Sequence, residues 1–315
     1  MTALDKTSKP NILIPKSIFE RIILNMKITE TRLRDPFVFA ENGIYYLYGT
    51  RCNGPLGSAQ GEGLDVYTST DLEEWSDPVE CFTRPANFWA DRDFFAPEIH
   101  KWKGSYYMFA SFRSLTHVRA THILKADSPM GPFVPVSDKP ATPEDRVCLD
   151  GTLYVDKEGN PWIVFCHEWT QIHDGTICAS RLTDDFSDTI GEPVLLFNAG
   201  QNDWLWSLTD HPNDYVTDGP FFHRKKDGKL IMLWSTFENA THRYVQTYAY
   251  SESGDIMGPW KHSPKPIYNN DGGHGMVFKA FDGQLYLTIH QPNGRPFERA
   301  RFFKIDEDET FPTDF

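Results

Sequence analysis

The stretch RDPFVFAENGIYYLYGT, from Arg34 to Thr50, joins an Asp-Pro pair to two short apolar runs. Asn42 and Gly43 separate these runs, and Asn-Gly is the favoured two-residue turn of a β-hairpin because both central residues must adopt positive φ. The stretch therefore predicts a hairpin. A hairpin requires neither Asp35 nor Pro36, so the carboxylate at the start of the first strand needs a separate explanation.

The same pattern returns four more times, with turns expected at Lys103-Gly104, around Glu158–Asn160, at Asp227-Gly228 and at Asp282-Gly283. Each unit holds about four short strands over roughly 50–65 residues, as a propeller blade does. Long helical periodicity is absent, which argues against α/β folds. The sequence thus predicts an all-β protein, a five-bladed β-propeller with four-stranded antiparallel blades around a central channel. Residues 31–315 would form this single domain, and residues 1–30 an N-terminal extension.

Composition limits the partners and the location. The 315-residue chain has a formal net charge of −13, which disfavours nucleic acid and anionic membranes because both require a basic face. It has no run of 18 consecutive apolar residues, so no membrane span is predicted. Five cysteines without a CxxC pair and the lack of a secretory signal predict a cytoplasmic protein. A secreted or periplasmic location would follow only if a signal had been removed.

Acidic residues occur where the blades are expected to converge. In a propeller the innermost strand of each blade runs along the channel, so the residues at its start meet at one end. The residues assigned to this position are Asp35, Glu98, Asp150, Asp218 and His274. A single Asp there is typical of a turn. Four acids brought together are costly unless the protein uses them, so the pattern predicts a functional site.

Five motifs carry a resemblance to a known family. They are RDPF at Arg34–Phe37, FAPEIH at Phe95–His100, LDGTLYVDKEGNPW at Leu149–Trp162, TDGPFF at Thr217–Phe222 and GGHG at Gly272–Gly275. In their order and spacing the chain resembles glycoside hydrolase family 43, five-bladed propellers that cleave arabinofuranosyl and xylosyl linkages with inversion. The resemblance implies that Asp35 is the general base, Asp218 the general acid, and Asp150 the residue that orients the acid and tunes its pKa. An inverting glycosidase needs one ionised and one protonated carboxyl group, and a third negative charge keeps the acid protonated.

The chain departs from the family pattern at the proton donor. Asp218 stands where the family has Glu, and its shorter side chain would place the carboxyl about 1 Å further from the glycosidic oxygen, enough to cost around 10²-fold in rate. Glu168 is the alternative donor and Glu98 the next. Phe95, where the family often has Trp, either stacks on the sugar or fills the core. Glu98, Glu168 and His274 are further candidates for substrate binding.

The resemblance also bears on cofactors. No cofactor is expected to be required, since no zinc motif or phosphate-binding loop is found. The family's histidine at the position of His274 often helps to bind a calcium ion or a water molecule on the axis, so His274 is also the candidate metal residue, for a structural calcium ion in the channel.

The expected partner is an oligosaccharide or polysaccharide of the plant type, cut by an α-L-arabinofuranosidase or β-xylosidase. Two alternatives are a propeller glycoside phosphorylase, which would need a basic pocket for phosphate, and a sugar-binding propeller without catalysis. Arabinose against xylose, and exo against endo action, depend on the loops Arg51–Gly63 and Asn198–Tyr215; the second carries Trp204 and Trp206.

Overall fold

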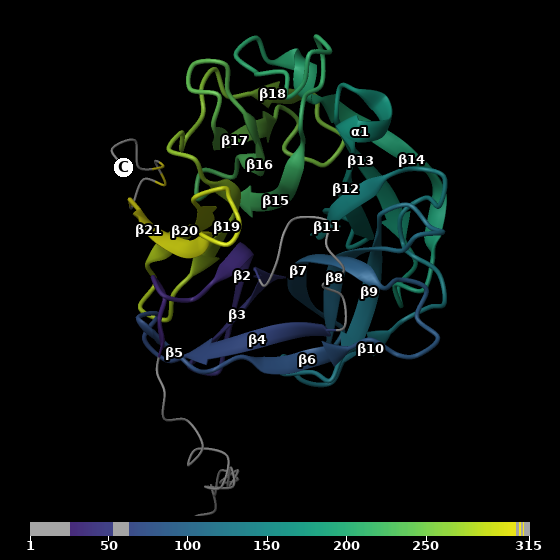
Figure 1. Cartoon of the computed structure of the whole chain (residues 1–315), viewed down its shortest axis with the longest axis vertical. Helices are drawn as coiled ribbons and strands as arrows, with labels where there is room; N and C mark the ends of the chain where they lie inside the picture. The colour runs from purple at the N-terminus through teal and green to yellow at the C-terminus, as the bar shows by residue number, and fades with distance from the viewer. Residues whose placement is uncertain (1–25, 53–62, 307–308, 310, 312–315) are drawn as a thin grey trace, which may run out of the picture.

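The computed structural model describes residues 26–52, 63–306, 309 and 311, and within them it forms five antiparallel sheets around a central axis (Figure 1). The predicted all-β, five-bladed propeller is therefore confirmed. The five hairpin turns also lie where the sequence places them. Their glycines, which are Gly43, Gly104, Gly159, Gly228 and Gly283, have φ between 81° and 92°, a region that side chains with a Cβ avoid.

In each blade the strands follow one another from the channel to the rim. Blade 1 consists of β2 (Leu33–Glu41), β3 (Ile44–Arg51), β4 (Gly63–Ser69) and β6 (Val79–Thr83). Blade 2 consists of β7 (Arg92–Trp102), β8 (Ser105–Arg113), β9 (Ala120–Ala126) and β10 (Val134–Pro135). Blade 3 consists of β11 (Cys148–Val155), β12 (Pro161–His167), β13 (Thr176–Leu182) and β14 (Thr189–Asn198).

Blade 4 consists of β15 (Asp218–Arg224), β16 (Leu230–Phe237), β17 (Tyr244–Ser251) and β18 (Trp260–His262), and blade 5 of β19 (Gly273–Lys279), β20 (Leu285–Gln291) and β21 (Arg299–Ile305). Helical structure in the described residues is confined to α1 (Trp169–Ile172) and the 3-10 turn η2 (Ala199–Gln201). No helix in the described part of the chain is long and apolar enough to cross a membrane.

The core lies between neighbouring blades. Buried apolar side chains of neighbouring sheets form shared clusters, and the largest fully buried ones include Trp75, Trp234 and Phe112. Phe112 of blade 2 meets Phe82 of blade 1 in an edge-to-face contact, with ring centroids 5.9 Å apart. Complete burial of one such side chain stabilises the fold by about 1.5–3 kcal/mol. This packing fixes the angle between blades, and so the positions of the innermost strands.

The segment before blade 1 helps to close the ring. Residues 1–25 of the expected extension lie outside the described residues. Met26–Lys27 form β1, which pairs with β5 (Glu74–Trp75) beside blade 1. Arg32 then forms an antiparallel bridge with Arg299 of β21, so the chain joins the first and last blades just before β2 begins.

A bulge repeats near the start of every innermost strand. Each bulge inserts two residues into the pairing with the second strand, and the first of the two has φ between 47° and 55°. These first residues are Asp35, Ala96, Asp150, Gly219 and His274. The sequence predicted one acid or histidine at the same position of each blade, and this is confirmed for Asp35, Asp150 and His274. Asp218 lies one residue before the first bulge residue of blade 4 and Glu98 two residues after that of blade 2, so the acids of these two blades lie outside the bulge itself.

Candidate active site

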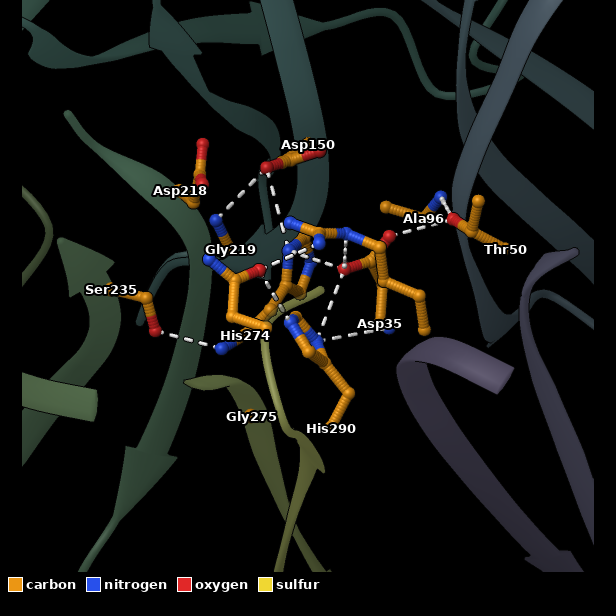
Figure 2. A network of polar contacts seen from close by, with 12 residues as sticks. Asp35, Thr50, Ala96, Asp150, Asp218, Gly219, Ser235, His274, Gly275 and His290 are labelled. Carbon is orange, nitrogen blue, oxygen red and sulfur yellow. Dashed lines mark hydrogen bonds and ion pairs between the residues drawn. The ribbon is translucent and has the colours of Figure 1, made fainter. Parts of the chain in front are cut away.

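Asp35 is buried near the start of β2, beside His274 and His290 (Figure 2). Its Oδ2 accepts a hydrogen bond of 2.6 Å from the Thr50 hydroxyl. Its Oδ1 makes no hydrogen bond with the described residues, but lies 3.2 Å from Nδ1 of His274 and 3.3 Å from Nε of Arg34. One oxygen is thus held in place, and the other remains able to accept a proton.

The surroundings of Asp35 favour its ionised form. Burial alone would raise the pKa of this carboxyl group, but His274 and Arg34 act against it and the Thr50 hydroxyl adds to them. The net effect holds the pKa of Asp35 well below its usual range. Asp35 is therefore a carboxylate throughout the neutral and mildly acidic range, as a general base must be.

Asp150 and Asp218 form a pair of carboxyl groups on the other side of His274 from Asp35. Asp150 is buried, its Oδ2 accepts a hydrogen bond of 3.1 Å from the Gly219 backbone N–H, and it lies 3.6 Å from Nδ1 of His274. Asp218 Oδ2 accepts a hydrogen bond of 3.0 Å from the Tyr244 hydroxyl. Figure 2 shows the two side chains on neighbouring strands, β11 and β15.

These two carboxyl groups hold on to a proton. Burial, followed by the charge of Asp150, raises the pKa of Asp218 to about 7. Burial and then the charge of Asp35 raise the pKa of Asp150 well above its usual value. Since two carboxylates in one buried site cannot both ionise cheaply, the pair titrates as a unit and retains one proton near neutral pH.

His274 separates the two groups of acids, and Gly219 makes room for it. A Cβ on Gly219 would approach the His274 ring to 2.7 Å, and Gly219 also has φ of 54°. Both facts require glycine at this position. The backbone of Gly219 therefore lies against the ring while its N–H binds Asp150, which links β11, β15 and β19 at one point.

The second strand of each blade orients the bulge of the next blade, a feature that the sequence reasoning missed. Thr50 accepts a hydrogen bond from the Ala96 N–H, Ser111 from Asp150, Ser235 from His274, and His290 from Asp35. The equivalent residue of blade 3 is Cys166, opposite Leu149 in the pairing. A thiol is a weak acceptor, and the Gly219 N–H binds Asp150 instead.

Arg34, Thr50, Tyr244 and His290 are thus site residues that were not predicted. Tyr244 is fully buried, and its ring stacks on His290 at 5.5 Å between centroids. Burial lowers the pKa of His290 well below its usual value, so its neutral ring accepts from Asp35 through Nδ1 and faces Asn293 through Nε2. The sequence did contain a signal for Thr50 and His290. In four of the five hairpins the second apolar run ends in a polar residue, which is Thr50, Ser111, Ser235 or His290.

Glu98 and Glu168 do not belong to the pair formed by Asp150 and Asp218. Glu98 directly follows the bulge, where it contacts His100 at 3.2 Å and lines a cavity of about 10 Å³ together with Asp35 and His274. Glu168 precedes α1 and accepts a hydrogen bond of 2.8 Å from Arg119, which also binds Asp93. The structure therefore places Glu168 at the rim, bound to an arginine, and Glu98 in the channel wall.

The aromatic candidates fall into two groups. Phe95 is half-buried beside the mouth, with the guanidinium groups of Arg119 and Arg295 at 5.5 and 5.4 Å from its ring. Trp204 packs against the core between blades 3 and 4. Trp206 stacks on the exposed His242 with centroids 4.3 Å apart. Residues 53–62 of the other predicted loop lie outside the described residues.

Comparison with known proteins identifies the family. The model of glycosyl hydrolases family 43 matches residues 26–307. The chain belongs to glycosyl hydrolase family 43. It is 41% identical to the endo-arabinase of Bacteroides thetaiotaomicron, with a TM-score of 0.82 over 89% of this chain and 96% of the other. The extracellular endo-α-(1→5)-L-arabinanase 1 of Bacillus subtilis is 25% identical over 241 residues, which are 72% of this chain and 67% of that protein.

The α-L-arabinofuranosidase of Lactobacillus brevis shares the fold of this family 43 enzyme, with a TM-score of 0.69 at 17% identity over 89% of this chain and 93% of the other. Membership makes the chain a glycosidase and its substrate a carbohydrate.

One expectation is wrong: a cytoplasmic location is contradicted by the Bacillus relative, which is an extracellular enzyme. The buried free cysteines do not restore it, because thiols enclosed in a core carry no information about the compartment.

Proposed function

We propose that this glycosidase hydrolyses α-(1→5)-linked L-arabinan at internal linkages, with inversion of the anomeric configuration. One observation carries the chemistry: Asp35, with its lowered pKa, faces a carboxyl pair, Asp150 and Asp218, with raised pKa values across His274. This is the division between base and acid that an inverting glycosidase needs.

In the proposed reaction, Asp35 takes a proton from water through Oδ1 while the oxygen of that water attacks the anomeric carbon. Asp218 gives its proton to the glycosidic oxygen as the bond breaks. Asp150 keeps the donor protonated through its charge, and its own position is fixed by Gly219. The departing product carries the transferred proton, and solvent exchange restores both carboxyl groups.

Asp218 is preferred to Glu168 as the donor because of their contacts. The Tyr244 hydroxyl occupies one oxygen of Asp218, which leaves the other free to carry a proton into the pocket. Arg119 donates a charged hydrogen bond to Glu168. A carboxylate held in this way acts as a hydrogen-bond acceptor, so Glu168 is less suited than Asp218 to donate a proton. We infer that Glu168 and Phe95 contact sugar units next to the cleaved bond.

Two observations support action on a polymer rather than on a chain end. A groove of about 470 Å³ extends from the mouth between blades 2 and 3, lined by residues 113–119, Val147, Glu168 and Thr170. Arg119 belongs to this groove and also to the surroundings of Phe95. The two arabinan-degrading relatives named above are both endo-acting.

The phosphorylase alternative is not favoured. Two arginines at the mouth are already neutralised, Arg34 by Asp35 and Glu298, and Arg119 by Asp93 and Glu168. A phosphate group would therefore have to compete with buried carboxylates for either of them.

The axial position near His274 suits a water molecule. The cavity there measures about 10 Å³, about the space that one water needs, whereas calcium takes six to eight oxygen ligands at about 2.3–2.6 Å. We propose water as its occupant, and no step of the reaction passes through a metal.

The test is digestion of linear α-(1→5)-arabinan, reduced arabino-oligosaccharides, xylan and the p-nitrophenyl glycosides of both sugars, with and without phosphate. We expect oligosaccharides of several lengths early in the arabinan digest, no phosphate dependence, and inverted configuration in proton NMR of the first product. Release of only monosaccharide, preference for xylan, or a sugar phosphate product would contradict the proposal.

A further inference from the structure

A second cluster of chemically active side chains lies in the loops beside blades 3 and 4. It consists of His173, which follows α1, and of His211 and Asp214, which belong to the connection between β14 and β15. One donor atom from each residue lies within 4.8 Å of the other two. Nδ1 of His173 is 2.7 Å from Oδ1 of Asp214, and Nδ1 of His211 is 3.3 Å from the same oxygen.

These distances are close to the spacing of ligands around one small ion. Donors at about 2.0–2.1 Å from a zinc ion, at angles of roughly 90–110°, lie about 2.9–3.4 Å from each other. The 3.3 Å between His211 Nδ1 and Asp214 Oδ1 lies in this range. The 2.7 Å between His173 Nδ1 and the same oxygen is that of a direct hydrogen bond and would lengthen slightly if an ion were bound.

Both imidazoles turn the same ring atom toward one carboxylate oxygen. Nδ1 of His211 and Nδ1 of His173 each face Oδ1 of Asp214. Positive charge, whether a proton or a metal ion, is stabilised between such atoms, and a metal ion can be shared by all three side chains.

The surrounding loops hold the three donors. Asp214 is 7% exposed at its side chain, its Oδ2 accepts a hydrogen bond from Thr209, and its N–H binds Ser207 at 3.0 Å. His173 has φ of 68° and ψ of −73°, the centre of a tight turn closed by a 2.9 Å hydrogen bond from Asp174 N to Ile172 O. Such a turn is rare and strained, and strain of this kind is typical of functional positions.

We propose that His173, His211 and Asp214 bind one divalent transition-metal ion of the zinc class. Two imidazoles and one carboxylate suit Zn²⁺, Ni²⁺ or Co²⁺, with water at the remaining positions. Ca²⁺ and Mg²⁺ are excluded by chemistry, because both prefer oxygen ligands alone. The two imidazole rings are stacked at 3.8 Å between centroids, so metal binding would require the exposed His211 ring to turn about its Cβ–Cγ bond and direct its nitrogen to the ion.

The ion would fasten two loops that the backbone already joins. Asp174 and Tyr215 form a parallel bridge, and the Tyr215 N–H binds the His173 carbonyl at 3.1 Å. Asp214 lies in one continuous segment with Trp206, which precedes it, and Asp218, which follows four residues later. A metal bound here would therefore stabilise the part of the rim nearest the proposed proton donor. The proposal concerns binding alone and does not rest on the proposed function.

The test is titration of the EDTA-treated protein with Zn²⁺ and, separately, Ca²⁺, followed by calorimetry and thermal unfolding without substrate. We expect one Zn²⁺ per chain with a dissociation constant in the micromolar range or below, a rise of a few degrees in Tm, and no response to Ca²⁺. Co²⁺ should give the visible absorption of a four- or five-coordinate ion.

His211→Ala and Asp214→Asn should each weaken Zn²⁺ binding by roughly 100-fold or more, because each removes a ligand. His117→Ala is the matched control, since His117 is an exposed histidine of another loop at the mouth and should leave binding unchanged. Both binding variants should unfold at the parent Tm in EDTA. The proposal is overturned if Zn²⁺ binding is not saturable at one ion per chain, if His211→Ala binds as the parent does, or if Ca²⁺ binds equally well.

Discussion

Replacement of Tyr244 by Phe tests the electrostatic account of the acid directly. The hydroxyl of Tyr244 donates a 3.0 Å hydrogen bond to Asp218 and is one of the contacts that lower the pKa of this carboxyl group. A hydrogen bond to a charged group contributes about 1.5–3 kcal/mol, and one to the neutral acid about 0.5–1.5 kcal/mol. The difference, about 1–1.5 kcal/mol, corresponds to roughly one pKa unit.

Tyr244→Phe should therefore raise the pKa of Asp218 from about 7 to roughly 8. A general acid works only while protonated, so the alkaline limb of the pH profile of kcat/KM should move upward by about one unit. The acidic limb, set by the lowered pKa of Asp35, lies below pH 4 and should not enter the measured range. The Phe ring keeps the stacking contact with His290, which limits any loss of packing.

The measurement is kcat/KM from pH 4 to pH 10 on an arabino-oligosaccharide, beside Tyr248→Phe as the control. Tyr248 lies on the same strand, β17, but its ring packs near Phe311, so its profile should match that of the parent. An alkaline limb that stays in place or moves downward in Tyr244→Phe would refute the assignment of Asp218 as the titrating acid.

Other predictions address the remaining parts of the site. Asp35→Asn should lower kcat on arabinan by roughly 10²–10⁴-fold while the protein stays folded, since the amide keeps the shape of the side chain but cannot accept a proton; because the lowered pKa of Asp35 shows that its charge stabilises the fold, Tm at neutral pH should fall, and more than a few per cent residual activity would exclude Asp35 as the base. Asp218→Asn should abolish cleavage of arabinan but spare a dinitrophenyl glycoside, whose leaving group needs no proton; if Glu168→Gln behaves this way instead, Glu168 is the donor. Asp218→Asn should also stabilise the protein at alkaline pH. The folded pKa of Asp218, about 7, exceeds the ordinary value of 3.8, so the parent loses stability as the pH rises from about 4 to 7, and calorimetry should show the Tm of the variant gaining by a few degrees over that window; a difference independent of pH would contradict the raised pKa. Thr50→Val should shift the acidic limb upward and lower the free energy of unfolding by about 1–3 kcal/mol, because it removes a hydrogen bond to Asp35 and leaves the Ala96 N–H unpaired; an unchanged acidic limb would show that Thr50 does not tune Asp35.

The sequence predicted the elements that depend on local chemistry. Asn42-Gly43 and the other Gly turns determine where each hairpin reverses, and Asp35-Pro36 marks the mouth of blade 1. These signals lie within a few residues of one another, so they can be found without knowledge of the fold.

The parts that were not predicted depend on register and on contacts between blades. Glu98 and Asp218 differ from Asp35 by two residues and by one residue in their place relative to the bulge, which cannot be seen before the strands are aligned. Tyr244 and His290 reach the site from strands other than the innermost ones, and His290 is 255 residues from the aspartate that it contacts. Neither contact leaves a trace in local sequence patterns.

The order in which a ribosome makes the chain gives the contact between the first and last blades a further meaning. Asp35 is among the first residues of the propeller to be synthesised, but His274 and His290, which position it, are made almost last. A nascent or truncated chain that ends before blade 5 would contain every proposed catalytic aspartate and still lack two of the side chains that hold the base in place. Hydrolytic activity would then appear only in chains whose ring has closed, so incomplete products of synthesis would be inert toward carbohydrate.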